Sequence, residues 1–196
     1  MTAATSRAPA APVAHRFTAT QRVIHWAMAV AILAMLFIGV GMVSTVRPDY
    51  LALVSIHKPL GIAILVLALV RLAVRLTVGT PGLPRDLPEP MKLAAALSHY
   101  LLYGLMFAMP LLGWSMLSAA AYPVQVLGFT LPPIAPQSDA LHTVLWNAHR
   151  TLAFAFFALI LVHIAAGLFH ALVRRDGVFE AMSPVPTNGG VVDPAE

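Results

Sequence analysis

Long apolar stretches without a charged side chain divide this sequence into four parts. No Lys, Arg, Asp or Glu occurs within residues 23–46, 59–70, 93–138 or 151–173. A helix needs about 20 predominantly apolar residues to cross the hydrocarbon core of a bilayer. The pattern therefore predicts four membrane-spanning helices, over about residues 23–44, 54–75, 94–118 and 147–172.

The composition also indicates a membrane protein. Of the 196 residues, 59% are hydrophobic and 10% are charged, and the mean hydropathy is +0.82. The first apolar stretch is longer than the core of a signal peptide, which has roughly 7 to 15 residues, so we expect it to remain in the mature chain. The predicted fold class is all-α: an integral membrane four-helix bundle over residues 16–182, between tails at 1–15 and 183–196 whose small, polar and Pro-rich composition predicts disorder.

The basic residues predict the orientation of this bundle. Four spans place both termini on one side of the membrane, and that side holds nine basic residues against three on the other. The positive-inside rule therefore predicts that both termini are cytoplasmic. Because the cations flank the spans, the pI near 10.0 indicates membrane orientation, and we expect no nucleic-acid partner. The three outer cations are Arg47, Lys58 and Arg150.

Histidine is the expected metal ligand, because the absence of cysteine excludes disulfides, thiolate iron–sulfur clusters and c-type haem attachment. Two of the eight histidines, His15 and His142, fall in the N-terminal tail and the outer loop, where we expect solvated side chains. Any one intramembrane histidine is equally explained by an interhelical hydrogen bond, but six together favour a functional site. These six are His25, His57, His99, His149, His163 and His170.

Their spacing predicts two stacked sites. His149 and His163 are 14 residues apart, which places them on nearly the same face of one helix, separated by roughly 21 Å along its axis. With alternating span directions, His25 meets the level of His163 and His57 meets the level of His149. Each pair is suited to supply two axial imidazoles to a haem iron. Spacing alone leaves His170 and His99 open as alternative partners of His25.

Five segments of the chain match successive sequence blocks, and they read "RFTATQRVIHW", "IHKPLGIAILVLALVRLAVRL", "LSHYLLYGLMFAMPLLGWSMLSA", "AHRTLAFAFFALILVHIAAGLFH" and "RRDGVFEAM". Together they resemble the bacterial cytochrome b561 family, which is related to the cytochrome b subunits of nickel–iron hydrogenases. The resemblance implies a four-helix protein of the bacterial inner membrane that carries two haems b and exchanges electrons with quinone. It also implies that His25 and His163 ligate one haem, and that His57 and His149 ligate the other.

Two arginines near the end of the second span are further site candidates. An intramembrane arginine costs at least about 2.5 kcal/mol on insertion scales unless it finds an anion or snorkels. Arg71 follows His57 by 14 residues, on nearly the same helix face and at the level expected for the inner haem. We expect it to bind a haem propionate, and Arg75 to bind the same group or a lipid phosphate. The alternative for both is snorkelling.

Three functions remain open on the sequence. The first is an electron carrier, acting as a quinone-linked oxidoreductase, that passes electrons between a small or protein donor and the quinone pool of a respiratory chain. Superoxide is one candidate donor, because the outer cations would attract an anion. The second is a haem-bearing membrane anchor for a separate dehydrogenase or hydrogenase. The third is a non-redox metal or proton transporter. All three have membrane lipid as a partner, and the first two admit a redox partner protein.

Overall fold

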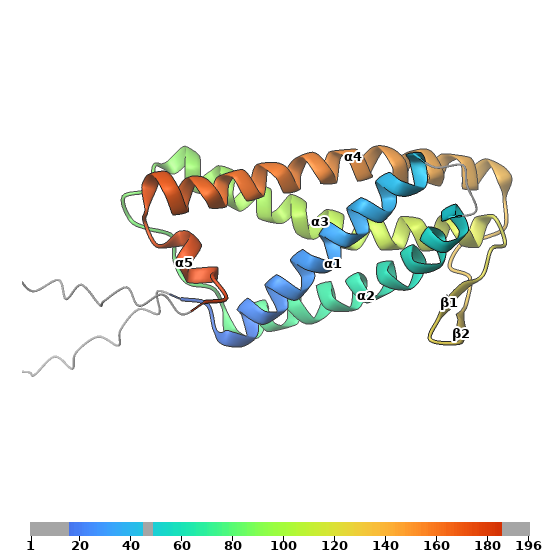
Figure 1. Cartoon of the computed structure of the whole chain (residues 1–196), viewed down its shortest axis with the longest axis horizontal. Coiled ribbons are helices and arrows are strands. Elements are labelled where there is room, and N and C mark those ends of the chain that lie inside the picture. The colour runs from blue at the N-terminus through green and yellow to red at the C-terminus, as the bar shows by residue number, and fades with distance from the viewer. Residues whose placement is uncertain (1–15, 45–48, 186–196) are drawn as a thin grey trace, which may run out of the picture.

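Four long helices form the body of the protein. The computed structural model describes residues 16–44 and 49–185. Figure 1 shows the helices lying lengthwise in a bundle, and each of them is long and apolar enough to cross a membrane. The predicted four-helix membrane bundle is therefore confirmed. The helices are α1 (Ala19–Ser44), α2 (Asp49–Val78), α3 (Glu89–Ala119) and α4 (Asp139–Phe169).

Local capping signals explain why α4 begins well before its apolar stretch. Ser138 is the N-cap, and its side chain accepts a hydrogen bond from the backbone N–H of Leu141 at 3.3 Å. Asp139 follows in the first turn, where the helix dipole favours a negative charge. His142 therefore lies on this helix and not in the outer loop, where we had expected a solvated side chain. Its Nδ1 is 3.0 Å from the carbonyl oxygen of Met116.

Three small elements were not predicted. The loop after α3 contains an antiparallel hairpin of β1 (Val124–Val126) and β2 (Phe129–Leu131). Its two turn residues, Leu127 and Gly128, have φ values of 49° and 85°, as a tight type I′ hairpin turn requires. At the other end of the chain, α4 continues into a π-helical turn, η1 (His170–Arg174), and a short helix follows, α5 (Val178–Met182).

Helices that are neighbours in the sequence pack against each other: α1 on α2, α2 on α3, and α3 on α4. The core lies where all four helices meet, and each of them contributes to it. Its buried side chains are Met28, Ala68, Met106, Phe156 and Ile160. Ala68 is fully buried, and a side chain of this size lets helix backbones approach closely in a membrane.

Both ends of the described chain meet at one end of the bundle (Figure 1). The backbone N–H of Phe17 donates to the carbonyl of Ala181 at 3.1 Å, and the Trp26 indole donates to the carbonyl of Met182 at 2.9 Å. Arg16 extends this contact by donating to the carbonyl of Val185 at 3.2 Å. The predicted N-terminal tail, and residues 186–196 of the predicted C-terminal tail, lie outside the described residues.

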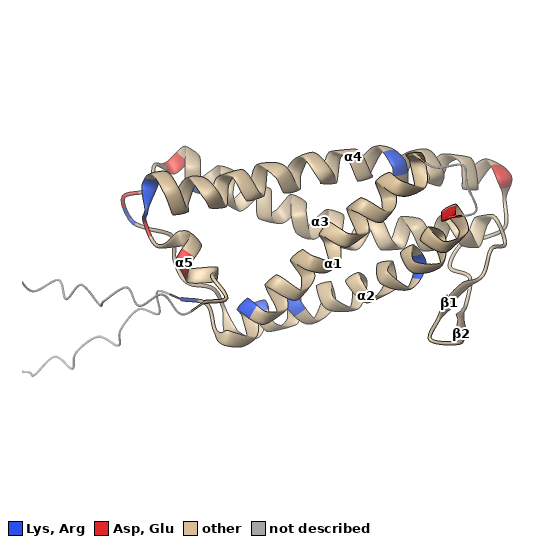
Figure 2. Ribbon diagram, viewed as in Figure 1, with Lys and Arg blue, Asp and Glu red and all other residues tan. Residues whose placement is uncertain are grey.

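Charged residues lie toward the ends of the bundle and leave most of the helix length apolar, as Figure 2 shows. We call the end that holds Arg16 and Val185, the ends of the described chain, the inner end, and the opposite one the outer end. Within the described ranges the outer end carries the cations Lys58 and Arg150. Arg47, predicted for the outer side, and Arg7, predicted for the inner side, fall outside those ranges. The positive-inside rule predicts that the inner end is cytoplasmic. Its basic residues in the described ranges are Arg16, Arg22, Arg71, Arg75, Arg85, Lys92, Arg174 and Arg175.

Replacing Ala68 by leucine tests the packing of the core. Because Ala68 is fully buried between helices, the larger side chain is expected to lower the free energy of unfolding by about 1–3 kcal/mol. The matched control is Ala73→Leu, at an exposed position of the same helix, which should leave stability unchanged. Thermal unfolding in detergent, followed by circular dichroism, measures both. Equal loss of stability in the two variants would contradict this core.

Candidate functional site

Two histidines face each other near the outer end of the bundle. His57 of α2 and His149 of α4 have ring centroids 6.2 Å apart, with an angle of 67° between the ring planes. The Nδ1 atoms of both rings are buried and have no hydrogen-bond partner among the described residues. Gly113 of α3 makes room for this arrangement, because a Cβ atom there would lie 3.3 Å from Cε1 of His149.

A second pair faces across the bundle toward the inner end. His25 of α1 and His163 of α4 have ring centroids 6.3 Å apart at an interplanar angle of 69°. His99 of α3 is the third ring of this region, with its centroid 5.6 Å from that of His163. Its Nδ1 lies 2.6 Å from the carbonyl oxygen of Ala95. That contact holds one nitrogen of His99 on its own helix.

One helix supplies a ring to each pair. His149 and His163 both belong to α4, and their spacing of 14 residues separates the two pairs by roughly 21 Å along the helix axis. The partner rings come from α1 and α2, which do not pack closely on α4 along their backbones. Each histidine pair therefore joins two helices whose backbones are not packed directly against each other.

The spacing of both pairs is that expected of two imidazoles that would hold one haem iron. A metal–imidazole bond of about 2.0 Å on each side, together with a ring radius of about 1 Å, places two opposed ring centroids roughly 6 Å apart. The observed distances are 6.2 and 6.3 Å. Because a porphyrin supplies the equatorial ligands of its iron, two side chains complete the coordination. Within residues 16–44 and 49–185, no cluster of three or more His, Asp or Glu is arranged to hold a bare metal ion.

His170 lies apart from both pairs. In the described part of the chain its ring contacts Phe169 and not His25. Its Nδ1 is 2.8 Å from a carboxylate oxygen of Asp176, and the Nε of Arg174 donates to the same oxygen at 2.8 Å. Arg174 also pairs with Asp86 at 3.0 Å, which connects the end of α4 to the loop between α2 and α3. Of the two sequence alternatives for a partner of His25, only His99 lies beside the pair.

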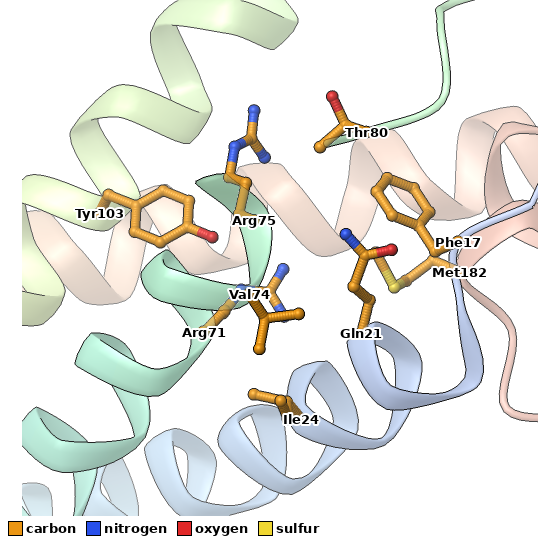
Figure 3. A pocket seen from close by; sticks show the side chains of 9 residues that line it. All are labelled: Phe17, Gln21, Ile24, Arg71, Val74, Arg75, Thr80, Tyr103 and Met182. Atoms are coloured by element: carbon orange, nitrogen blue, oxygen red, sulfur yellow. The ribbon is translucent and has the colours of Figure 1, made fainter. Parts of the chain in front are cut away.

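Arg71 and Arg75 line a pocket at the inner end, shown in Figure 3. Both guanidinium groups contact the Tyr103 ring of α3, with their Cζ atoms 6.0 and 5.6 Å from its centroid. Gln21, on the α1 side of the pocket, donates to the carbonyl of Gly79 at 2.7 Å. The residues that line the pocket include two cations and no carboxylate. This is an environment for an anionic group.

Comparison with known proteins identifies the class. The family model for prokaryotic cytochrome b561 matches residues 16–184. The chain belongs to the prokaryotic cytochrome b561 family. Two similar proteins are cytochrome b561 homologs 1 and 2 of Escherichia coli, each 28% identical, over 87% and 85% of this chain and 98% and 90% of theirs. A third, 31% identical over 66% of this chain and 73% of its own, is the probable superoxide oxidase CybB of Yersinia pestis.

Membership of the cytochrome b561 family establishes the general function. The protein is a bacterial membrane protein of electron transfer, and its family implies that it binds haem b. The resemblance seen in the sequence is therefore confirmed at the level of the family. The pairing of the four histidines and the roles of Arg71 and Arg75 stay predictions, for which the distances above supply the geometry.

The outer cations of this cytochrome b561 lie beside the outer histidine pair in the sequence. Lys58 follows His57 and Arg150 follows His149. The Nζ of Lys58 donates to the carbonyl of Pro123 at 3.4 Å, and Arg150 is exposed. Arg47, the third cation predicted for this end, lies outside the described residues.

The network around Asp176 was not predicted, although the Asp-Gly dipeptide at the end of the last apolar stretch was a turn signal. The Asp176 side chain is 9% exposed. Burial opposes its ionisation, but hydrogen bonds from Arg174, His170 and the backbone of Val178 hold the pKa of this carboxyl below its ordinary value. The ionised form of Asp176 therefore joins η1 to α5, next to the contacts that hold the start of α1.

Replacing Asp176 by asparagine is expected to lower the free energy of unfolding at pH 7 by about 1–3 kcal/mol, because charged hydrogen bonds are lost. A carboxyl with a lowered pKa contributes its stability above the unfolded pKa of about 3.9 and loses it as the pH falls through the folded pKa. The difference between the two proteins should therefore be full at pH 7 and shrink below about pH 4. Thermal unfolding at both pH values measures it. A difference that persists unchanged in acid would contradict the charged network.

Proposed function

We propose that this protein is a dihaem electron carrier that passes electrons from a donor at its outer end to the quinone pool. The observation that supports this most directly is the presence of two histidine pairs with the same separation, 6.2 and 6.3 Å between ring centroids. His57 and His149 would hold the outer haem, and His25 and His163 the inner one. When bound, each haem supplies a one-electron redox centre whose potential depends on its ligands, burial and hydrogen bonds.

In this proposal, the side chains of the protein position the two haems and surround them with apolar groups. The four histidines set the order of the sites along α4, and the core of Met28, Ala68, Met106, Phe156 and Ile160 lies among the four helices. Gly113 keeps α3 clear of the His149 ring. No side chain has to form or break a covalent bond, so the proposed site has no catalytic residue in that sense.

Arg71 and Arg75 are proposed to bind a propionate of the inner haem. Both lie on α2 in the pocket at the inner end, and Tyr103 contacts both guanidinium groups. A guanidinium binds a carboxylate in a bidentate manner when its orientation is fixed. The cation–π contacts with Tyr103 would favour that orientation, and the carboxylate would offset the cost of an arginine so close to the apolar part of α2.

Superoxide is the donor that we propose, with quinone as the acceptor. The support is twofold: one similar protein is a probable superoxide oxidase, and the described outer end offers Lys58 and Arg150 next to the proposed outer ligands. One electron leaves each superoxide anion and yields dioxygen. Two electrons and two protons convert a quinone to a quinol.

Haem content tests the ligand pairs. The purified protein should contain two haems b by pyridine haemochrome, and His25→Ala and His57→Ala should each retain one, because each removes one axial ligand. His99→Ala and His170→Ala are the matched controls and should retain both. Reduced-minus-oxidised spectra show which haem is lost in each variant. A variant of His99 that loses the same haem as His25→Ala, while His163→Ala keeps it, would contradict the proposed inner pair.

Electron entry tests the donor. Superoxide generated outside vesicles that contain the purified protein and quinone should yield quinol without another protein. The double variant Lys58→Gln, Arg150→Gln is expected to slow this about tenfold at low ionic strength, because the local attraction for an anion is lost, and to differ little from the parent at high salt. The control pair, Arg85→Gln and Lys92→Gln, changes two cations of the inner end and should have no effect.

A protein that keeps two haems but is not reduced by superoxide would point to the alternative role of a membrane anchor. Reduction only after a separate dehydrogenase or hydrogenase is added would establish that role. A haem-free protein that carries a divalent metal or protons across vesicles would instead establish the transporter. The three outcomes are distinct, because haem content and quinol formation are measured on the same preparation.

A further inference from the structure

The hairpin at the outer end exposes large apolar side chains. Leu127, at its turn, is 92% exposed, and Phe129, which begins β2, is 76% exposed. The register pairs Val126 with Phe129 and Val124 with Leu131, so these four side chains share one face, while Gln125 and Thr130 share the other. No charged residue occurs from Pro123 to Ser138. A soluble loop of this kind would be expected to carry polar residues at its tip.

The base of the hairpin is held firmly on the bundle. Val124 is 4% exposed, and β1 packs against α2 and α3. The Nζ of Lys58 donates to the carbonyl of Pro123 at 3.4 Å, and the Trp114 indole donates to the carbonyl of Pro132 at 3.1 Å. An isolated two-stranded hairpin is only marginally stable, so these contacts determine where the exposed tip lies.

The hairpin points sideways from the bundle and not away from its end. Figure 1 shows β1 and β2 leaving the outer end next to α2 and projecting across the direction of the helices. Lys58, which contacts the base, lies nine residues after Asp49, the first residue of α2, and is therefore about 14 Å along that helix. The base of the hairpin thus lies beside α2, and not beyond the end of that helix.

The length of α2 places this level at the membrane surface. Its 30 residues span about 45 Å, whereas the hydrocarbon core of a bilayer is about 30 Å thick. The excess of about 15 Å is shared between the two ends of α2, so the level of Lys58 lies near the boundary between headgroups and acyl chains, and a tip that projects sideways there meets lipid. An uncharged tip with leucine and phenylalanine is suited to the boundary between headgroups and acyl chains.

We propose that the tip of the β1–β2 hairpin inserts into the lipid leaflet at the outer end and anchors this end of the bundle. Leu127 and Phe129 enter the boundary between headgroups and acyl chains, with Lys58 at the base close to lipid phosphate. The partner is the lipid itself, because the tip is uncharged and projects sideways at the level of helices that are apolar enough to cross a membrane. This inference does not depend on haem binding or on the electron donor.

Site-directed spin labelling tests the anchor directly, because the natural chain has no cysteine. Leu127→Cys is labelled in vesicles of phosphatidylcholine and phosphatidylglycerol, and the accessibility of the label to oxygen and to a water-soluble nickel chelate is compared. Val66→Cys, at a position of α2 that is 53% exposed, reports the acyl chains. Asp139→Cys, at the exposed start of α4, reports water at the same end.

The expected result is an oxygen-to-nickel ratio for Leu127→Cys several-fold above that of Asp139→Cys and below that of Val66→Cys. A ratio equal to that of Asp139→Cys would overturn the proposal and leave the tip as a surface for a protein partner. Line broadening between labels on two molecules would overturn it in favour of contact between copies. An unchanged circular dichroism spectrum and unfolding temperature in Leu127→Cys verify that the fold is intact, and the measurement of depth needs no activity.

Discussion

The pairing of two histidine rings of α4 with rings of α1 and α2 is the constraint on which the rest of the structure depends. A polar ring within an apolar bundle is costly while it lacks a partner or a bound group. Helix α4 carries two such rings 14 residues apart, and the Nδ1 of one of them, His149, has no hydrogen-bond partner among the described residues. The rings that face them come from α1 and α2. Because His25 faces His163 and His57 faces His149, α1 and α2 lie across from α4 at different levels. Helix α3 packs against both α2 and α4.

The roles of smaller residues follow from this arrangement. Ala68 and Gly113 are positions where a side chain would intrude, one on the crossing of helices in the core and the other on the ring of His149. Arg71 and Arg75 place their charges at the inner end, where the Cζ atoms of both guanidinium groups lie 6.0 and 5.6 Å from the centroid of the Tyr103 ring. Small residues therefore occur where rings and helices approach closely. The two arginines occur where a haem propionate is proposed to bind.

The two ends of the bundle are built differently. The inner end is closed by α5 and by the network in which Asp176 receives hydrogen bonds from His170 and Arg174. The outer end has few charges in the described ranges and carries the hairpin with its exposed tip. A donor that arrives at the outer end would therefore meet Lys58 and Arg150, with Asp49 and Asp139 as the acidic residues of that end in the described ranges.

The sequence by itself determined that the protein is a membrane protein, the number of its membrane-spanning helices, and its family. The uncharged stretches and the spacing of histidines that carry these conclusions depend on local order along the chain. It also limited the partner of His25 to a few histidines. Only the tertiary structure brought His163 beside His25 and His99 beside His163, and placed His170 in a network with Asp176. Periodicity specifies the face and level of a residue on its own helix, but not which helices are neighbours. The hairpin was missed for a related reason: its stability comes from Lys58 and Trp114, contacts distant in sequence that no pattern within Pro123–Ser138 contains.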